Sequence, residues 1–237
     1  MESFEREARR IRLAYEEYDR DLGCAGKWSP DNPGNRAIVE ERESLLKQML
    51  REHGFWPLTP FRILDVGCGT GGTLARVAEW GARPENLVGI DLLPERIARA
   101  RERYPHITFY VGNAAEAPFP PESFDLVFAF TVFSSILDDR LARAVAQKIW
   151  YVLKPDGAVV WYDLRYPNPF NRKVRPLTRS KIRDLFPEAH ADLRPATLLP
   201  PLARRLRSDW LPVLYPLLAR IHPLKGHFLG ILHKRKR

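Results

Sequence analysis

Short apolar runs alternate with amphipathic segments through the middle of the chain. The runs predict buried strands at 63–66, 86–90, 107–111, 123–130 and 158–162. The segments between them have apolar residues at helical spacing, and they predict helices at 73–80, 94–103 and 141–153. Strand and helix units in this order predict a doubly wound parallel sheet with right-handed crossovers, which binds ligands at the carboxyl ends of its strands.

Two amphipathic helices are predicted before this region, joined by a polar loop. The first spans 4–22 and carries Tyr15 and Tyr18 on its apolar side, and the second spans 37–53 with Arg42 facing outward. The simpler interpretation of the first helix is that its aromatic residues dock on the core. The alternative is a lid in which Tyr15 or Tyr18 faces a bound ligand.

The C-terminal part of the chain mixes several kinds of element. A short helix is predicted over 178–186, with Thr178 as its cap, and strands are predicted at 193–199 and 226–233, the last one antiparallel. Between these strands, 202–221 is both apolar and basic, and its prolines break it into short helical pieces.

A glycine-rich turn directly follows the first predicted strand, in the stretch 62–72. Gly67, Gly69 and Gly72 have the G-x-G-x-x-G spacing, and glycine lets backbone N–H groups approach a ligand closely. The spacing alone is compatible with a dinucleotide site. Asp65 precedes the first glycine by two residues, and its charge repels a pyrophosphate but attracts an ammonium group.

Residues 64–71, LDVGCGTG, closely resemble the first motif of the class I S-adenosylmethionine-dependent methyltransferases. The resemblance continues in 89–94, GIDLLP, in 123–130, and in the turn 153–157, where Asp156 replaces a glycine of the family pattern. It implies an α/β fold with a doubly wound, seven-stranded, mostly parallel sheet and an N-terminal helical cap. The motifs are those of the branch that acts on small molecules.

The resemblance also divides the chain and implies a cofactor. It predicts a helical cap over 1–58, a Rossmann-like cofactor-binding core over 59–165, and over 166–237 a completion of the sheet with a basic, apolar helical insert. S-adenosyl-L-methionine is the implied cofactor. The predicted cofactor-binding residues are Asp65, Gly67, Cys68, Gly69, Gly71, Asp91, Leu92, Asn113, Ala114, Phe130 and Thr131.

Several of these residues have a stated role. A carboxylate that ends a second parallel strand, here Asp91, can accept hydrogen bonds from both ribose hydroxyls, although the same side chain could simply cap the next helix. Asn113 stands where the family often has Asp, and it is predicted to accept the adenine amino group. The loop 130–135 is expected near the methyl group, with Ser134 and Ser135 where many relatives carry a histidine pair.

Substrate contacts are predicted from the first helix and from two loops. The residues are Tyr15, Tyr18, Phe133, Ser134, Ser135, Arg165 and Tyr166. A hydroxyl acceptor must lose its proton, and Asp163, which ends the fifth strand, is the candidate catalytic base. His222 or His227 is the second choice, and each of the three is more often structural in such a position.

Composition and charge narrow the setting. The chain is 237 residues long, 45% hydrophobic and 28% charged, with two cysteines that lack metal-site spacing, so we predict one globular unit and no metal. Its N-terminus is charged, and no apolar run is long enough to span a bilayer, which favours a cytoplasmic location. The net charge is +9, but nine basic residues and one acidic residue lie in 198–237. The rest is nearly neutral, which argues against a nucleic-acid groove.

The sequence therefore predicts an S-adenosylmethionine-dependent methyltransferase with a small-molecule acceptor. A hydroxyl of a sugar, glycolipid or secondary metabolite is favoured, so O-methylation is expected. The alternatives are C-methylation of a lipid-like quinone, a cofactor-binding protein without turnover, and a nicotinamide-dependent oxidoreductase. Residues 198–237 leave two interpretations open, a helical cover over the substrate pocket and a peripheral contact with membrane or lipid.

Overall fold

The computed structural model describes residues 2–20, 29, 31–169 and 171–234. These residues form a seven-stranded sheet in the order β3-β2-β1-β4-β5-β7-β6. The strands are β1 (Ile63–Val66), β2 (Leu87–Asp91), β3 (Thr108–Val111), β4 (Phe124–Phe130), β5 (Leu153–Leu164), β6 (Ala189–Leu198) and β7 (Lys225–Lys234). Strand β7 is antiparallel to both of its neighbours, and the other pairings are parallel, which confirms the predicted fold.

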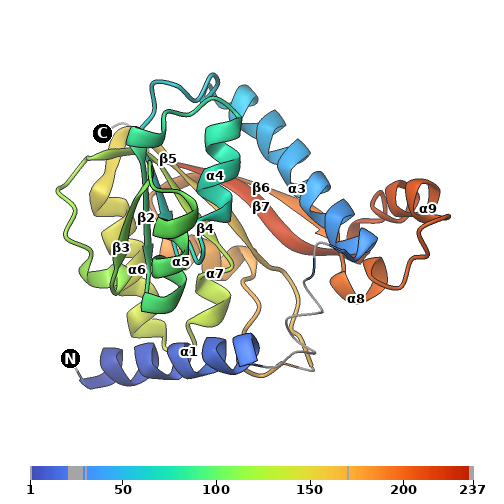
Figure 1. The fold of residues 1–237 in the computed structure, drawn as a ribbon, viewed down its shortest axis with the longest axis horizontal. Helices are drawn as coiled ribbons and strands as arrows, with labels where there is room; N and C mark the ends of the chain where they lie inside the picture. The colour runs from blue at the N-terminus through green and yellow to red at the C-terminus, as the bar shows by residue number, and fades with distance from the viewer. Residues whose placement is uncertain (1, 21–28, 30, 170, 235–237) are drawn as a thin grey trace.

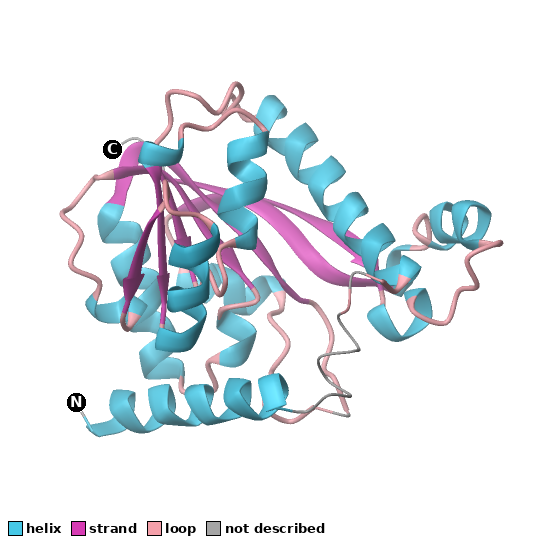
Figure 2. Ribbon diagram, in the orientation of Figure 1, coloured by secondary structure: helices cyan, strands magenta, loops and turns pink. Residues whose placement is uncertain are grey.

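Helices cover both faces of this sheet. The longer helices are α1 (Glu2–Arg20), α3 (Pro33–Glu52), α4 (Gly72–Glu79), α5 (Pro94–Arg103), α6 (Asp139–Val152), α7 (Arg179–Leu185) and α9 (Leu211–Leu218). Helices α3, α4 and α5 pack on one face, and α6 and α7 pack on the other. Helix α1 runs across the carboxyl ends of the central strands (Figure 1; Figure 2), beside the short 3₁₀ helix η3 (Phe133–Ser135).

Burial on both faces explains the apolar runs of the sequence. All four residues of β1 are buried, as expected of a central parallel strand covered by helices. Alternate residues of β5 divide between the two cores: Trp161 packs among α6 and α7, and Tyr162 belongs to the core under α3. Phe133 stacks on Trp161, with the ring centroids 4.9 Å apart, so the loop after β4 is anchored in the core.

Some boundaries differ from the sequence predictions. Strand β6 begins at Ala189, four residues before the predicted start, and the predicted turn 153–157 forms the first part of β5. The loop predicted between the two N-terminal helices falls largely on residues 21–28 and 30, which lie outside the described residues. No helix in the described part of the chain is long and apolar enough to cross a membrane.

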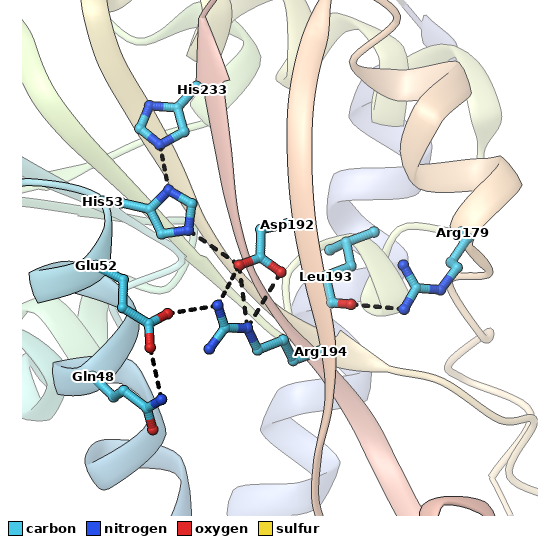
Figure 3. Close-up of polar contacts among 8 residues, drawn as sticks. All are labelled: Gln48, Glu52, His53, Arg179, Asp192, Leu193, Arg194 and His233. Carbon is cyan, nitrogen blue, oxygen red and sulfur yellow. Dashed lines mark hydrogen bonds and ion pairs between the residues drawn. The ribbon is translucent and has the colours of Figure 1, made fainter.

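A polar network fixes the end of α3 to the outer strands (Figure 3). His53 Nδ1 lies 2.8 Å from His233 Nε2, and His53 Nε2 lies 3.1 Å from Asp192 Oδ2. Arg194 donates to Asp192 and to Glu52, which is on α3 itself. This network stabilises the packing of α3 on β6 and β7.

The insert between β6 and β7 contains α8 (Pro200–Ala203) and α9, which confirms the short helical pieces predicted there. It lies at the outer end of the molecule, beyond α3 (Figure 1). Because β6 and β5 are both antiparallel to β7, β6 runs parallel to β1–β5. The insert, which follows β6, therefore starts on the side of the sheet where β1–β5 have their carboxyl ends.

Candidate active site

A cavity of about 170 Å³ opens at the carboxyl ends of β1, β2 and β4. Its walls come from the ends of these strands, from the loop after β3, and from α1, η3 and α6. This is where a doubly wound parallel sheet binds its ligand, because the strand order reverses between β1 and β4. The cavity coincides with the region in which the sequence motifs meet.

The glycine turn and the end of β2 are joined by one carboxylate. Asp91 accepts the Gly69 N–H on Oδ2 and the Leu93 N–H on Oδ1, each across 2.9 Å. Gly67, Gly69 and Gly71 all have positive φ, at 69°, 53° and 82°, so the turn requires residues without a Cβ. Each carboxylate oxygen of Asp91 has a further lone pair available for a ligand hydroxyl.

Asp65 is a buried carboxyl group with an unsatisfied oxygen. It is 2% exposed, and its Oδ2 has no hydrogen-bond partner among the described residues. Burial, and then the charge of Asp91, raise the pKa of Asp65 to about 8, while Arg42 acts in the opposite direction. A buried acceptor without a partner costs free energy, so this site favours a cation that approaches Oδ2.

Arg42 corrects the prediction that this side chain faces outward. Its guanidinium carbon lies 5.4 Å from the ring centroids of both Phe130 and Tyr162, at the ends of β4 and β5. The Nε atom is buried and has no hydrogen-bond partner in the described part of the chain. The Arg42 guanidinium is close enough to Asp65 to act on its charge. Each of the two side chains has one buried polar atom without a hydrogen-bond partner among the described residues.

Helix α1 is held over the cavity by charged contacts. Arg96, on α5, donates to Asp19 at 2.7 Å, and its guanidinium lies 4.7 Å from the centroid of the Tyr15 ring. Glu7 accepts the Leu137 N–H at 2.6 Å, which fixes the other end of the helix to the loop after η3. Tyr15 lines the cavity, and burial raises the pKa of its hydroxyl.

The loop after β4 lies between the cavity and Asp163. Ser135 Oγ is 2.8 Å from the Tyr15 hydroxyl on the cavity side, and the Ser134 N–H donates to Asp163 Oδ2 at 3.0 Å on the other side. Asp163 is 0% exposed, and burial raises its pKa to about 6. An acceptor hydroxyl reaches Asp163 only if the loop opens.

The structure brings most of the predicted cofactor residues to one place. Those that line the cavity are Gly67, Asp91, Leu92, Asn113, Ala114, Phe130 and Thr131. Asp65, Gly69 and Gly71 belong to the strand and turn beside it. The Cys68 thiol instead packs against Gly89, where an added Cβ would lie 2.7 Å from the sulfur.

Asn113 already has a structural role. Its Oδ1 accepts the Ala115 N–H at 3.0 Å and thereby caps the 3₁₀ helix η2 (Ala114–Glu116). The amide oxygen can accept a second hydrogen bond, and its nitrogen can donate. The predicted contact with an adenine amino group stays a prediction with this added constraint.

The predicted substrate residues are divided between the cavity and its surroundings. Tyr15 and Ser135 line the cavity, whereas Phe133 and Ser134 are buried in the core behind it. Tyr18 donates to Asn171 at 3.0 Å.

Two further predicted substrate residues lie together at the end of β5. Arg165 donates to the His222 carbonyl, and its guanidinium lies over the Tyr166 ring at 4.8 Å.

The second-choice bases are placed differently from each other. His227 is buried, stacks on Tyr162 with centroids 4.6 Å apart, and contacts Thr197 Oγ1 through Nδ1 at 2.7 Å. Burial, then the charge of Arg42, lower its pKa to about 3. His222 lies in the exposed 3₁₀ helix η4 (His222–Leu224).

Sequence reasoning did not select Arg42, Arg96 or Ile11, although Arg96 and Ile11 line the cavity. Arg96 had a usable signal, because a basic residue in the first turn of a helix is unfavourable there unless it has a partner. Arg42 had none, because helical spacing alone does not show that two aromatic rings meet this turn of α3.

Comparison with known proteins agrees with the geometry. Residues 63–157 match a family described as "Methyltransferase domain". Over 115 residues the chain is 37% identical to a demethylmenaquinone methyltransferase of Chlorobaculum parvum, covering 48% of this chain and 45% of that protein. Over 138 residues it is 32% identical to an O-methyltransferase of Penicillium expansum, covering 55% and 48%. The chain thus spans about half the length of the curated relatives it matches.

Solved structures extend the fold comparison beyond the matched core. A SAM-dependent methyltransferase from Archaeoglobus fulgidus superposes with a TM-score of 0.56 at 15% identity, over 80% of this chain and 93% of that one. At 15% identity this similarity shows a shared fold, which in this chain is the seven-stranded sheet β1 to β7 with its helices.

Proposed function

We propose that this chain is a class I S-adenosylmethionine-dependent methyltransferase that methylates a hydroxyl group of a small acceptor molecule; residues 63–157 match a family described as "Methyltransferase domain". The observation that most directly supports the cofactor assignment is the cavity at the carboxyl ends of β1, β2 and β4, with Asp91 at its wall and Asp65 Oδ2, which has no hydrogen-bond partner among the described residues, beside it.

The side chains present fit the cofactor at both of its ends. Asp65 Oδ2 is a buried acceptor without a partner among the described residues, and it could accept a hydrogen bond from the α-ammonium group of the cofactor. The Nε–H of Arg42 is also unused, and it could donate to the carboxylate of the cofactor. Asp91 would hold the ribose hydroxyls, and Asn113 lies where the base would end. When bound, S-adenosylmethionine supplies a methyl group that its positive sulfur already activates.

The protein then has to position the acceptor and exclude water. Tyr15, Phe130, Thr131 and Ser135 meet at the end of β4, and together they supply two apolar rings and three hydroxyl groups. The Tyr15 and Ser135 hydroxyls are hydrogen-bonded to each other. One hydroxyl can therefore orient an acceptor oxygen while the other fixes the position of the first hydroxyl. When the methyl group is already activated, alignment of the acceptor oxygen with it can supply much of the rate acceleration.

The proton of the acceptor hydroxyl needs a destination. The carboxyl of Asp163 is our candidate, because its raised pKa of about 6 is closer to neutral pH than that of an ordinary aspartate. The Ser134–Ser135 loop would have to open before Asp163 accepts this proton, since the loop separates Asp163 from the cavity. The Tyr15 hydroxyl stays protonated at neutral pH because burial raises its pKa.

Calorimetry and a transfer assay test the proposal in two steps. S-adenosylhomocysteine should bind and NAD should not, and binding of NAD alone would contradict the cofactor assignment. With methyl-labelled S-adenosylmethionine, label should appear in hydroxylated acceptors, and mild chemical blocking of the hydroxyl should abolish it. Binding of the cofactor without transfer to hydroxylated acceptors would leave the cofactor assignment intact and reject the acceptor class.

A second candidate is methylation of a ring carbon on a lipid-like quinone. The observation that favours it is the 37% identity over 115 residues to a demethylmenaquinone methyltransferase. Reduced naphthoquinones in the same assay separate the two candidates, because a C-methyl product resists the demethylation that removes an O-methyl group.

A further inference from the structure

Helix α9 has apolar residues on two opposite sides. On the inner side, Leu211, Tyr215 and Leu218 pack in a small core with Ile38 of α3 and Ala203 of α8. On the outer side, five residues that we call the α9 stripe are exposed: Trp210 (60%), Val213 (56%), Leu214 (36%), Leu217 (51%) and Ile221 (47%). Their spacing of three, four and seven residues from Trp210 places the helical members on one face.

Hydrogen bonds fix which side of α9 faces outward. The buried Tyr215 donates its hydroxyl to Glu41 Oε2 at 2.8 Å, and Glu41 also accepts Lys225 Nζ at 2.9 Å and the Thr197 N–H at 3.0 Å. Rotation of α9 to hide the stripe would take the buried Tyr215 hydroxyl away from its partner Glu41. The stripe therefore stays at the surface as a permanent feature of the fold.

The charges around the stripe are almost all positive. Arg205 and Arg207 precede it and Arg220 lies within it, and all three are exposed. Asp209 is the single acidic residue in 198–237. Against a second copy of the same surface these arginines would repel each other, so the charge favours an anionic counterpart.

We propose that the α9 stripe and its arginines bind the interface of an anionic phospholipid bilayer. A tryptophan beside aliphatic residues, with basic residues around them, is the arrangement that inserts into the headgroup region of a membrane. Each arginine near a negative surface strengthens such binding, and salt weakens it. The insert and the cavity both lie at the carboxyl ends of the strands. A protein bound to the membrane through the α9 stripe would therefore turn this side of the sheet toward the lipid.

The test compares vesicle binding of surface variants without any cofactor, so it is independent of the proposed reaction. The probe is a vesicle of phosphatidylcholine with phosphatidylglycerol, and the readout is co-sedimentation. The full chain should bind these vesicles better than phosphatidylcholine alone. The double variant Trp210→Ser with Leu217→Ser should bind about tenfold more weakly. Arg207→Gln with Arg220→Gln should lose about tenfold in affinity and part of the salt dependence.

A matched control removes an exposed aromatic residue elsewhere. Tyr151, on α6, is 50% exposed, and Tyr151→Ser should bind vesicles as well as the unmodified chain does. Equal binding by the α9 variants and the control would overturn the proposal. It would also be overturned if the full chain ignored anionic vesicles while sedimentation showed a dimer that Trp210→Ser dissociates, because the stripe would then be an interface between copies.

Discussion

The Gly69 N–H donates to Asp91 Oδ2 across 2.9 Å, so the glycine turn after β1 and the end of β2 are one structural unit. Asp91 also accepts the Leu93 N–H at the entry to α5. One carboxylate thus fixes two loops and, with its remaining lone pairs, faces the cavity. Its proposed ribose contact and its structural role therefore depend on the same carboxylate.

Replacing Asp91 with Ala should weaken binding of S-adenosylhomocysteine by about 100-fold, since hydrogen bonds to a charged acceptor contribute about 1.5–3 kcal/mol each. Asp91→Asn keeps one oxygen acceptor and should lose less. Titration calorimetry gives both affinities, and denaturant unfolding reports how much of the effect comes from a looser turn. Unchanged affinity in Asp91→Ala would contradict the proposed cofactor pose.

Asp65 and Arg42 should act only on the amino-acid end of the cofactor. Asp65→Asn and Arg42→Met are each expected to weaken S-adenosylhomocysteine binding by about tenfold, because each removes one charge-assisted hydrogen bond. 5′-Methylthioadenosine lacks the amino-acid group, so its affinity should not change. An equal loss for both ligands would mean that these substitutions disturb the site as a whole.

Binding of an ammonium group should expel a proton from Asp65. The pKa of this carboxyl is raised to about 8, so it is mostly protonated at pH 7, and an ammonium ligand favours the ionised form. The affinity of the protein for S-adenosylhomocysteine should therefore rise between pH 6.5 and pH 7.5. Calorimetry in buffers of different ionisation enthalpy measures the released proton, and Asp65→Asn should release fewer protons by about one.

Gly71 should be the least replaceable residue of the turn. An added Cβ would lie 2.8 Å from Phe109 Cζ, and the φ of 82° is unfavourable for other residues. Gly71→Ala should lower the free energy of unfolding by about 2–4 kcal/mol. Gly72→Ala is the matched control, because nothing lies within 4 Å of its added Cβ, and it should change stability by less than about 0.5 kcal/mol. Similar losses for both would contradict this explanation.

The sequence predicted the parts of the site that lie in short motifs at the ends of strands. The turn from Gly67 to Gly71 and the carboxylate Asp91 end neighbouring strands, so a parallel sheet brings them together once the strands are recognised. The position of Arg42 depends on how α3 packs on the sheet so that its side chain reaches Phe130 and Tyr162, which helical spacing does not specify. The exposure of Trp210 likewise depends on Tyr215 binding Glu41, a contact between residues 174 positions apart.

His227 links this packing to pH. Its pKa is lowered to about 3 by burial and by Arg42, whereas in the unfolded chain it should be near 6.5. Below pH 6.5 the unfolded state binds a proton that the folded state does not, so folding stability falls as pH decreases. From pH 6.5 to pH 5 the expected loss is about 2 kcal/mol.

The variant His227→Asn isolates this contribution. It should be less stable than the unmodified chain at pH 7.5, because it loses the stacking on Tyr162, but it should lose less stability between pH 6.5 and pH 5. Asp65 and Asp163 have raised pKa values and act with the opposite sign, but they are present in both proteins and cancel in the difference. Urea unfolding at several pH values supplies the comparison, with the exposed His222→Asn as control. Parallel pH curves for His227→Asn and the unmodified chain would contradict this explanation, because they would show that His227 has the same pKa in the folded and unfolded states.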